Sequence, residues 1–336
     1  MERVEIKGAR IAGICACVPR NAVRNEAKVA EATGIVTRRI AAEGTTVVDL
    51  CVKAAERVLS ETGAKPEDFG AILCVSFTSR DRMPAAAVQA QARLGFPKGI
   101  IAFDVSLACS GWGYGLYLAG LLARETGKKV LLLDGDVQSA RVGRGEGEKV
   151  RGGDVSSLLG DAGTATIVEL NEECGTKTEE LWKFSFVADG EKGDALRLED
   201  GGTIRMDGFG VFKFVATDVV AYIKDFLSHL PIFPPSHPLT FSPSHPLTFS
   251  PSFTFVPHQP NAYMVRQLAK SVGIDEARTA ISCDELGNLS SASVPATIAW
   301  KGVRGPILFA GFGGGLSVSV GLIDLDDGCK LSVLEV

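Results

Sequence analysis

The sequence lacks the features of a membrane-spanning or exported chain. No apolar run approaches the roughly 20 residues that a membrane-spanning helix needs. The first seven residues, Met-Glu-Arg-Val-Glu-Ile-Lys, are charged and contain no apolar core of the kind found in signal peptides. These absences predict a soluble, cytoplasmic protein that does not associate with membranes.

Metal-binding and disulfide patterns are missing too. The eight cysteines are scattered, and no two of them are paired at the spacing of a zinc site. Cys15 and Cys17 come nearest, but the alternating sequence around them places both thiols on one face of a strand. We therefore expect free thiols in a reducing compartment, and no metal site.

The chain has no excess of positive charge. Its 35 Lys and Arg residues face 40 Asp and Glu residues, a net charge of -5, which argues against a general nucleic-acid-binding protein because such proteins need basic surfaces. With 336 residues, 46% of them hydrophobic, the chain is long enough to bury a large core. Two domains or one duplicated unit are expected at this length.

Short apolar strands alternate with amphipathic helices along the first half. Strands are predicted at 4–17, 71–77, 100–106, 129–134 and 163–170, and helices at 46–62, 85–94 and 111–122. This alternation is typical of an α/β fold, and it predicts a largely parallel sheet with both faces covered.

The second half repeats the plan. Helices are predicted at 211–227, 262–272 and 291–300, after a mixed region at 181–189, with strands ending near 258, around 279–283, and at 307–312 and 316–323. The strand-turn-strand segments 131–170 and 307–323 occupy matching places. We therefore predict two structural repeats, residues 1–172 and 173–336.

Residues 231–252 interrupt this alternation. Residues 236–243 read Ser-His-Pro-Leu-Thr-Phe-Ser-Pro, and 244–251 repeat those eight letters, so His237 and His245 are repeat content rather than metal ligands. Proline at this density excludes a helix or a central strand and predicts an extended surface insertion. A long surface loop costs little closure entropy, which favours a tolerated insertion over a partner-binding loop.

One cysteine stands where a thiol is chemically useful. Cys109 follows the strand predicted at 100–106 and precedes the helix predicted at 111–122. Free backbone N–H groups and the helix dipole at such a turn lower the pKa of a thiol, and the thiolate is the attacking species. A buried, inert cysteine is the alternative.

Three later turns add polar residues and glycines. His258 ends a predicted strand, Asn288 stands at a Gly turn before a helix, and the glycines of 311–315 allow close approach of bare backbone. Each signal is weak alone. Their order and context together with Cys109 are far more specific.

These motifs carry a family resemblance. They read Ala-Cys-Ser-Gly at 108–111, Val-Pro-His-Gln at 256–259, Gly-Asn-x-Ser-x-Ala-Ser-Val-Pro at 287–295 and Gly-Phe-Gly-Gly-Gly at 311–315. In that order the chain resembles the β-ketoacyl-[acyl-carrier-protein] synthase III family of condensing enzymes. The resemblance implies a thiolase-like fold with two pseudo-symmetric α/β halves in a layered α-β-α-β-α arrangement.

The resemblance also implies the chemistry. Cys109 would take an acyl group from acyl-CoA or an acyl-carrier-protein thioester, and the acyl-enzyme would condense with malonyl-carrier protein as carbon dioxide leaves. His258 and Asn288 would donate hydrogen bonds to the thioester oxygen. The oxyanion hole would be formed by backbone N–H groups of Cys109, Gly313, Gly314 and Gly315. No metal and no tightly bound cofactor is implied.

Substrate contacts follow from the same resemblance. Met83, reaching across a homodimer interface, and Phe312 would line the acyl channel, with plain interface packing as the alternative for Met83. An acidic acyl carrier protein would meet Lys213, Arg266 and Lys270, for which ordinary solvated helix faces are the alternative. Residues 25–32 lack the tryptophan and arginine that grip coenzyme A in the family, which favours a carrier-bound donor.

Two other functions stay open. A thiolase-fold acyltransferase would pass the acyl group to an oxygen or nitrogen acceptor, and a hydrolase would pass it to water. A non-catalytic partner subunit would keep only the fold. The joint presence of Cys109, His258 and Asn288 argues against the partner subunit, because packing does not require all three.

Overall fold

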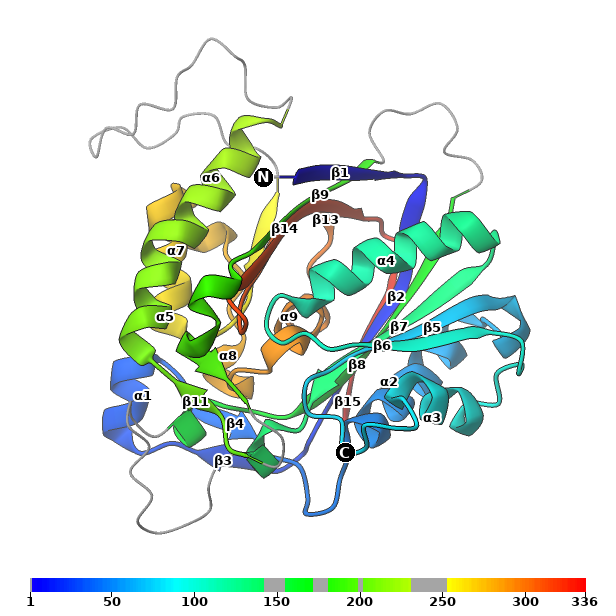
Figure 1. Cartoon of the computed structure of the whole chain (residues 1–336), viewed down its shortest axis with the longest axis horizontal. Coiled ribbons are helices and arrows are strands. Elements are labelled where there is room, and N and C mark those ends of the chain that lie inside the picture. The colour runs from blue at the N-terminus through cyan, green and yellow to red at the C-terminus, as the bar shows by residue number, and fades with distance from the viewer. Residues whose placement is uncertain (1, 142–154, 172–180, 199–201, 231–252) are drawn as a thin grey trace.

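The computed structural model describes residues 2–141, 155–171, 181–198, 202–230 and 253–336 (Figure 1). The proline-rich repeat predicted at 231–252, with His237 and His245, lies outside the described residues, and so does Cys174.

Two mixed sheets form the body of the described chain (Figure 1). The six-stranded sheet runs in the order β15 (Lys330–Glu335), β2 (Ala9–Val18), β8 (Ala162–Leu170), β7 (Lys129–Asp136), β5 (Phe69–Val75), β6 (Ile101–Val105). The five-stranded sheet runs in the order β1 (Glu2–Lys7), β9 (Leu181–Ala188), β14 (Ser317–Leu325), β13 (Gly305–Gly313), β12 (Thr254–Pro257). Two short pairs complete the strands: β3 (Ala22–Arg24) with β4 (Thr37–Arg39), and β10 (Leu196–Arg197) with β11 (Arg205–Met206).

The sheets contain fewer parallel pairs than the alternation of strands and helices predicted. In the six-stranded sheet β15–β2, β7–β5 and β5–β6 are parallel, whereas β2–β8 and β8–β7 are antiparallel. In the five-stranded sheet only β12–β13 is parallel. The prediction of a largely parallel sheet therefore holds for three of the five pairs in the six-stranded sheet and is wrong for the five-stranded sheet, where strands joined by a short turn, such as β13 and β14, can only return antiparallel.

The helices form three layers around the sheets (Figure 1). Helices α4 (Gly111–Thr126) and α9 (Ser293–Lys301) are packed between the two sheets, and α2 (Val47–Thr62) and α3 (Ala86–Arg93) cover the outer face of the six-stranded sheet. Helices α6 (Val220–Ser228) and α7 (Ala262–Val272) cover the outer face of the five-stranded sheet, and α5 (Gly208–Phe214) leads into α6. Two short helices, α1 (Ala27–Thr33) and α8 (Cys283–Leu286), lie outside these layers. The layered α-β-α-β-α fold is confirmed.

The helix α2 shows how local sequence fixes an element. Its predicted start is confirmed, because Thr46 accepts a hydrogen bond from the backbone of Asp49 while the Asp49 carboxylate accepts one from the Thr46 backbone. This capping box satisfies N–H groups that the first helical turn leaves unpaired. The helix ends where Gly63 adopts a left-handed φ of 71°.

Gly8 divides the single strand predicted at 4–17 into two. Its φ of 69° lies in the left-handed region that favours glycine, and the chain there passes from β1 in one sheet to β2 in the other. At the far end β15 returns to pair with β2. Each sheet therefore includes one strand from the opposite end of the chain, and the division into 1–172 and 173–336 stays a prediction.

Three further sequence predictions differ from the structure. The strand predicted at 279–283 is reduced to a single bridge between Phe255 and Thr279, because the chain turns into α8 at Cys283. The helix predicted at 211–227 has a π-helical segment, Val215–Val219, between α5 and α6. The strand β6 belongs to a sheet that was predicted to have both faces covered, yet it lies at an exposed sheet edge, where Ile101 is 42% exposed.

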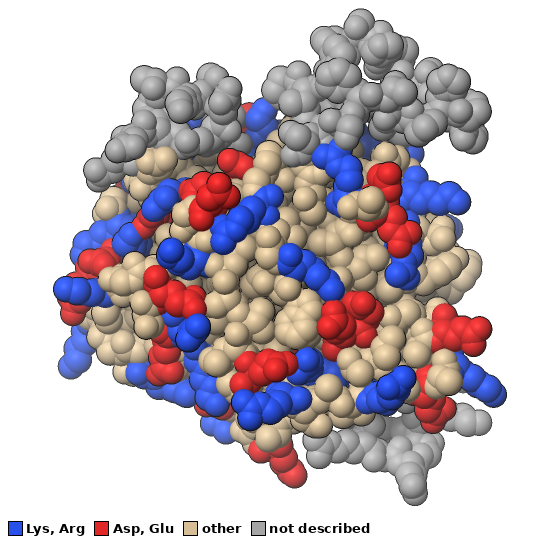
Figure 2. Space-filling view, turned by 180° about the vertical axis from the view of Figure 1, so that it is seen from behind, with Lys and Arg blue, Asp and Glu red and all other residues tan. Residues whose placement is uncertain are grey.

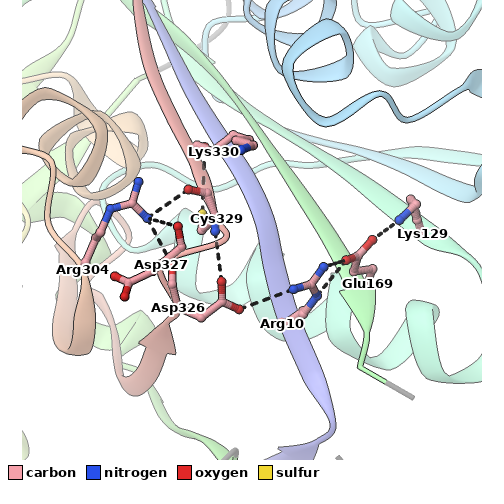
Figure 3. Close-up of polar contacts among 8 residues, drawn as sticks. All are labelled: Arg10, Lys129, Glu169, Arg304, Asp326, Asp327, Cys329 and Lys330. Carbon is pink, nitrogen blue, oxygen red and sulfur yellow. Dashed lines mark hydrogen bonds and ion pairs between the residues drawn. The ribbon is translucent and has the colours of Figure 1, made fainter. Parts of the chain in front are cut away.

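A network of ion pairs and hydrogen bonds holds the turn before β15, the last strand, against the six-stranded sheet (Figure 3). The largely buried Glu169 carboxylate on β8 pairs with Arg10 and with Lys129, and Arg10 also reaches Asp326 at 3.5 Å. Nη1 of Arg304 donates to the backbone oxygens of Asp326 and Cys329 at 3.1 and 2.9 Å. These contacts fix the turn from which β15 returns to β2.

Acidic and basic side chains are interspersed over the face seen in Figure 2. Within the described ranges, no helix is long and apolar enough to cross a bilayer. The described His, Cys, Asp and Glu residues include no group of three or more that could hold a metal ion. The seven described cysteines are free thiols.

Candidate active site

Cys109 lies in the turn between β6 and α4, as predicted from its sequence context. The turn is closed by a hydrogen bond from the Gly111 N–H to the Ala108 oxygen at 2.7 Å. Its next residue, Ser110, is held by β14: the Ser110 and Ser317 hydroxyls are 2.7 Å apart, and Ser319 Oγ donates to the Ser110 backbone oxygen at 2.8 Å. The turn that carries Cys109 in the first half is thus anchored to a strand of the second half.

The glycine-rich loop after β13 passes directly over Cys109. A Cβ atom at Gly313 would lie 2.8 Å from Cys109 Cβ and 3.0 Å from its Sγ, closer than side chains tolerate, and the Gly313 φ of 147° also favours glycine. The Gly314 backbone N–H lies near enough to the Cys109 sulfur to lower the pKa of the thiol. The structure therefore brings the predicted glycine loop and the predicted nucleophile together.

His258 follows β12 and is buried. Its backbone N–H donates to the Ala310 oxygen at 2.7 Å, and its Nδ1 lies 3.1 Å from the Ser290 backbone oxygen. A carbonyl oxygen only accepts, so Nδ1 carries the proton and Nε2 has a free lone pair. Burial lowers the pKa of His258 to about 3, which keeps the ring neutral at physiological pH.

This tautomer bears on the role implied for His258. Its Nε2 accepts a proton in the free enzyme, and it can donate to a thioester oxygen only after taking a proton up. The ring of Phe312 packs edge-on against the imidazole with centroids 5.4 Å apart, which helps to fix its orientation.

Asn288 is held by its backbone and by one side of its amide. Its N–H donates to the Leu158 oxygen at 2.8 Å, and its own backbone oxygen accepts from the Gly160 N–H at 2.9 Å and from Gln138 Nε2 at 2.8 Å. The side-chain oxygen accepts from the Ser290 N–H at 2.9 Å. No described residue accepts from the side-chain NH₂, which is left available in the cavity that Asn288 lines.

The protonation state of Cys109 corrects the sequence prediction. Burial raises the pKa of its thiol to about 11, a larger effect than the lowering by the Gly314 N–H and by the Ser290 hydroxyl. The prediction of a lowered pKa is wrong for the free enzyme, because loss of hydration outweighs the helix terminus. The thiol is therefore protonated at neutral pH and would need a proton acceptor to react as a thiolate.

Sequence reasoning missed two residues beneath Cys109. Ser290 has its Oγ 4.0 Å from the Cys109 sulfur, and it is the one non-glycine residue with positive φ, 55°, in the described parts of the chain. The buried Asp136 on β7 accepts hydrogen bonds from Ser76 and Thr78, and burial raises its pKa to about 7. Two aspartates inside the apolar run 130–137 were the available signal, because buried carboxylates are rare without a reason.

A mainly apolar cavity of about 280 Å³ opens beside Cys109 and Asn288. Its apolar walls come mostly from residues 155–159 and from the β10–β11 segment; they include Phe77, Leu107, Val155, Leu158, Leu159, Leu196, Leu198, Ile204 and Met206. Neither predicted wall residue is among those that line it: Met83 is 87% exposed, and Phe312 is buried against His258.

The residues predicted to meet a carrier protein lie on two neighbouring helices. Lys213 is exposed on α5, and Arg266 and Lys270 are exposed on α7. Arg266 forms an ion pair with Glu276 at 2.7 Å. Three large exposed hydrophobic residues share these helices, Phe209, Phe212 and Tyr263.

Comparison with known proteins gives a consistent result. Residues 103–190 match the family described as 3-oxoacyl-[acyl-carrier-protein] synthase III, and residues 253–325 match its C-terminal region. A β-ketoacyl-[acyl-carrier-protein] synthase III from Hyphomonas neptunium is 30% identical over 314 residues, which cover 89% of this chain and 90% of the relative.

The chain belongs to the β-ketoacyl-[acyl-carrier-protein] synthase III family.

Other synthase III relatives agree. One from Vibrio vulnificus is 30% identical over 307 residues, covering 87% of this chain and 88% of the relative. The crystal structure of a 3-oxoacyl-(acyl-carrier protein) synthase from Burkholderia xenovorans superposes with a TM-score of 0.84 at 27% identity, covering 100% of this chain and 99% of the other. Membership of the synthase III family makes the chain an acyltransferase of the condensing type.

Proposed function

We propose that this protein catalyses decarboxylative condensation of an acyl thioester with malonyl-carrier protein through an acyl group on Cys109. The observation that carries the proposal is the convergence of the Cys109 thiol, the free amide NH₂ of Asn288 and the glycine loop on one apolar cavity. The names of the synthase III relatives support an acyl-carrier-protein substrate.

In the first step Cys109 takes the acyl group. Nε2 of His258 accepts the thiol proton as the sulfur attacks the thioester carbon, the bond to the leaving sulfur breaks, and that sulfur takes the proton from His258. Ser290 contacts both residues, with its hydroxyl near the Cys109 sulfur and its carbonyl on His258 Nδ1. Backbone N–H groups of Cys109 and of Gly313, Gly314 and Gly315 hold the oxyanion.

In the second step the malonyl carboxylate leaves as carbon dioxide, and its electron pair forms an enolate. Asn288 donates from its free NH₂ to the enolate oxygen, an amide donor that does not titrate. His258 supports the same oxygen when its Nε2 is protonated. The enolate carbon attacks the acyl carbon, a C–C bond forms, the C–S bond breaks, and the Cys109 sulfur recovers a proton from solvent.

This chemistry needs only the thiol, the imidazole, an amide and backbone N–H groups. We therefore propose no tightly bound cofactor and no metal. The donor is acyl-CoA or acyl-carrier protein. Residues 25–32 favour the carrier protein, because the side chain of Asn25 donates to the Ile35 oxygen and accepts from Arg38 and is therefore not available to bind coenzyme A.

An acidic carrier protein would dock on the face of α5 and α7. Lys213 and Lys270 are exposed and have no ion-pair partner among the described residues, and the exposed Phe209 and Phe212 add apolar area beside them. A charge reversal at Lys213 is expected to raise the KM for the carrier protein while kcat stays unchanged.

A homodimer would complete the acyl channel. Met83 is 87% exposed in the single chain, and the edge strand β6 exposes Ile101 and Phe103. An unpaired edge with apolar side chains is a ready site for a second strand, and pairing there would bury Met83 near the partner's cavity.

Intact-mass measurement after incubation with acyl-CoA and acyl-carrier-protein thioesters tests the function. The expected result is a single acyl adduct that is absent in Cys109→Ser, together with release of carbon dioxide from malonyl-carrier protein. Loading without that release would indicate transfer to an oxygen or nitrogen acceptor. Absence of any adduct would contradict enzymatic acyl transfer and favour a non-catalytic subunit.

A further inference from the structure

Gln138 is an anomaly in the apolar cavity beside Cys109. It lies two residues after the end of β7, at the start of the 3-10 helix Gln138–Arg141, is only 3% exposed, and lines the cavity among leucine and isoleucine side chains. A buried amide in such surroundings is expected to have all its polar atoms paired, because an unpaired one loses its hydration without compensation.

The nitrogen of the Gln138 side-chain amide donates both of its hydrogen bonds. Nε2 donates one hydrogen bond to the Gly160 backbone oxygen at 2.9 Å and one to the Asn288 backbone oxygen at 2.8 Å. Both partners are carbonyl oxygens, which only accept, so the orientation of the amide is fixed: nitrogen lies on their side and oxygen on the other.

The oxygen of the same amide, Oε1, has no hydrogen-bond donor among the described residues, and this atom is not sealed inside the protein. Since the side chain is almost wholly buried and lines the cavity, Oε1 reaches open space there. The cavity therefore carries a fixed acceptor that a purely hydrocarbon chain would cover and leave unsatisfied.

We propose that Gln138 selects an acyl chain that carries a hydroxyl group, whose O–H donates to Oε1. This inference rests on the proposed function, since the chain is the one loaded on Cys109. Gln138 also holds the backbone of Asn288, so the acceptor is rigidly placed relative to the reaction centre. A site built to bind a polar group discriminates strongly against an analogue that lacks it.

The experiment compares loading of Cys109 by hexanoyl thioester and by its 3-, 4- and 5-hydroxy isomers, with rates from intact mass. At least one isomer is expected to load about tenfold faster than hexanoyl, the scale of one net hydrogen bond to a buried acceptor. If hexanoyl loads as fast as every hydroxy isomer, the inference is overturned while the proposed function stands. If none of the four loads while an acetyl thioester does, the inference is overturned and the proposed function stands; if no acyl thioester loads, both are overturned.

Two variants assign the preference to Gln138. Gln138→Leu is expected to lower the ratio of hydroxyhexanoyl to hexanoyl loading towards one, whatever its absolute rate. Leu159→Met changes an apolar wall residue of similar volume and is expected to keep the wild-type ratio. A preference that survives in Gln138→Leu would show that another group selects the hydroxyl.

Discussion

At the scale of single residues, opposing effects on one sulfur atom set the pKa of the Cys109 thiol. Burial and the nearby Asp136 carboxylate raise the pKa of Cys109, whereas the Gly314 N–H and the Ser290 hydroxyl lower it. With a pKa of about 11 the thiol is protonated at neutral pH, so the proposed acylation includes removal of its proton. The charge of Asp136 therefore affects the pKa of the Cys109 thiol, although no hydrogen bond joins the two side chains.

Replacing Asp136 by asparagine is expected to make Cys109 more reactive. Removal of the carboxylate lowers the thiol pKa, and we expect alkylation by iodoacetamide at pH 9 to accelerate about three- to tenfold, a shift of about half to one pKa unit. The rate is followed by peptide mass at Cys109. Asp134→Asn is the matched control, since Asp134 is a buried carboxylate on the same strand but is not among the main groups that shift the pKa of Cys109. An unchanged rate in Asp136→Asn would contradict the electrostatic link.

At the scale of elements, the site depends on how closely a loop approaches a turn. The loop after β13 and the turn before α4 come from different halves of the chain, and the serine contacts between Ser110 and β14 hold them in register. Glycine is required at Gly313, where the backbone passes the Cys109 sulfur. Two residues further on a side chain has room, since a Cβ at Gly315 would meet nothing within 4 Å.

The substitution Gly313→Ala is therefore expected to impair acylation of Cys109. The new methyl group would overlap the Cys109 side chain and displace the proposed oxyanion donors, and loss of such donors typically costs about 10²- to 10³-fold. Gly315→Ala shares the strain of positive φ but has room for its methyl group, so we expect a much smaller loss. Single-turnover loading of the two variants makes the comparison. Equal losses would show that backbone strain, and not the contact with Cys109, is the cause.

At the scale of the whole molecule, two sheets enclose α4 and α9, and each sheet includes a strand from the opposite end of the chain. The halves cannot separate without breaking the β1–β9 and β15–β2 ladders. In the single chain, the edge strand β6 exposes apolar side chains that no other described residue covers.

A charge on that edge is expected to prevent dimer formation. Ile101→Lys places a lysine on the apolar edge, and edge lysines oppose strand pairing. Sedimentation velocity should show a dimer for the wild type and a monomer for this variant. Val36→Lys, at another exposed apolar position, should remain dimeric. A monomeric wild type would contradict the proposed assembly.

The buried Asp136 also predicts how stability depends on pH. Its pKa is raised from 3.8 to about 7 in the folded chain, so between these values the native state binds a proton that the unfolded state releases. This contribution is present in full below pH 3.8 and is lost as the pH rises through 7. Urea unfolding should show the wild type gaining about 2 kcal/mol over Asp136→Asn between pH 7 and pH 5.

The comparison with Asp136→Asn removes the opposite effect of His258. Burial lowers the pKa of His258 to about 3, so the stability that it contributes is present above pH 6.5 and is lost as the pH falls towards 3. That loss is common to both proteins and cancels. A difference in unfolding free energy that does not change with pH would mean that Asp136 is ionised in the native state throughout this range.

The sequence by itself determined most elements and the identity of the polar groups at the site. Periodicity predicted α2, α3, α4, α7 and the β13–β14 pair, because their burial follows regular patterns of apolar residues. The motifs placed Cys109, His258, Asn288 and the glycine loop at element ends, which is where the structure has them.

Only the tertiary structure decided what those groups do together. The break at Gly8, the exchange of strands between sheets and the antiparallel pairs depend on contacts between distant segments, which local patterns do not encode. The raised pKa of Cys109, the tautomer of His258 and the free oxygen of Gln138 each arise from burial beside particular partners. Burial and hydrogen-bond geometry are properties of the folded chain, so they could be read only once its two halves were in place.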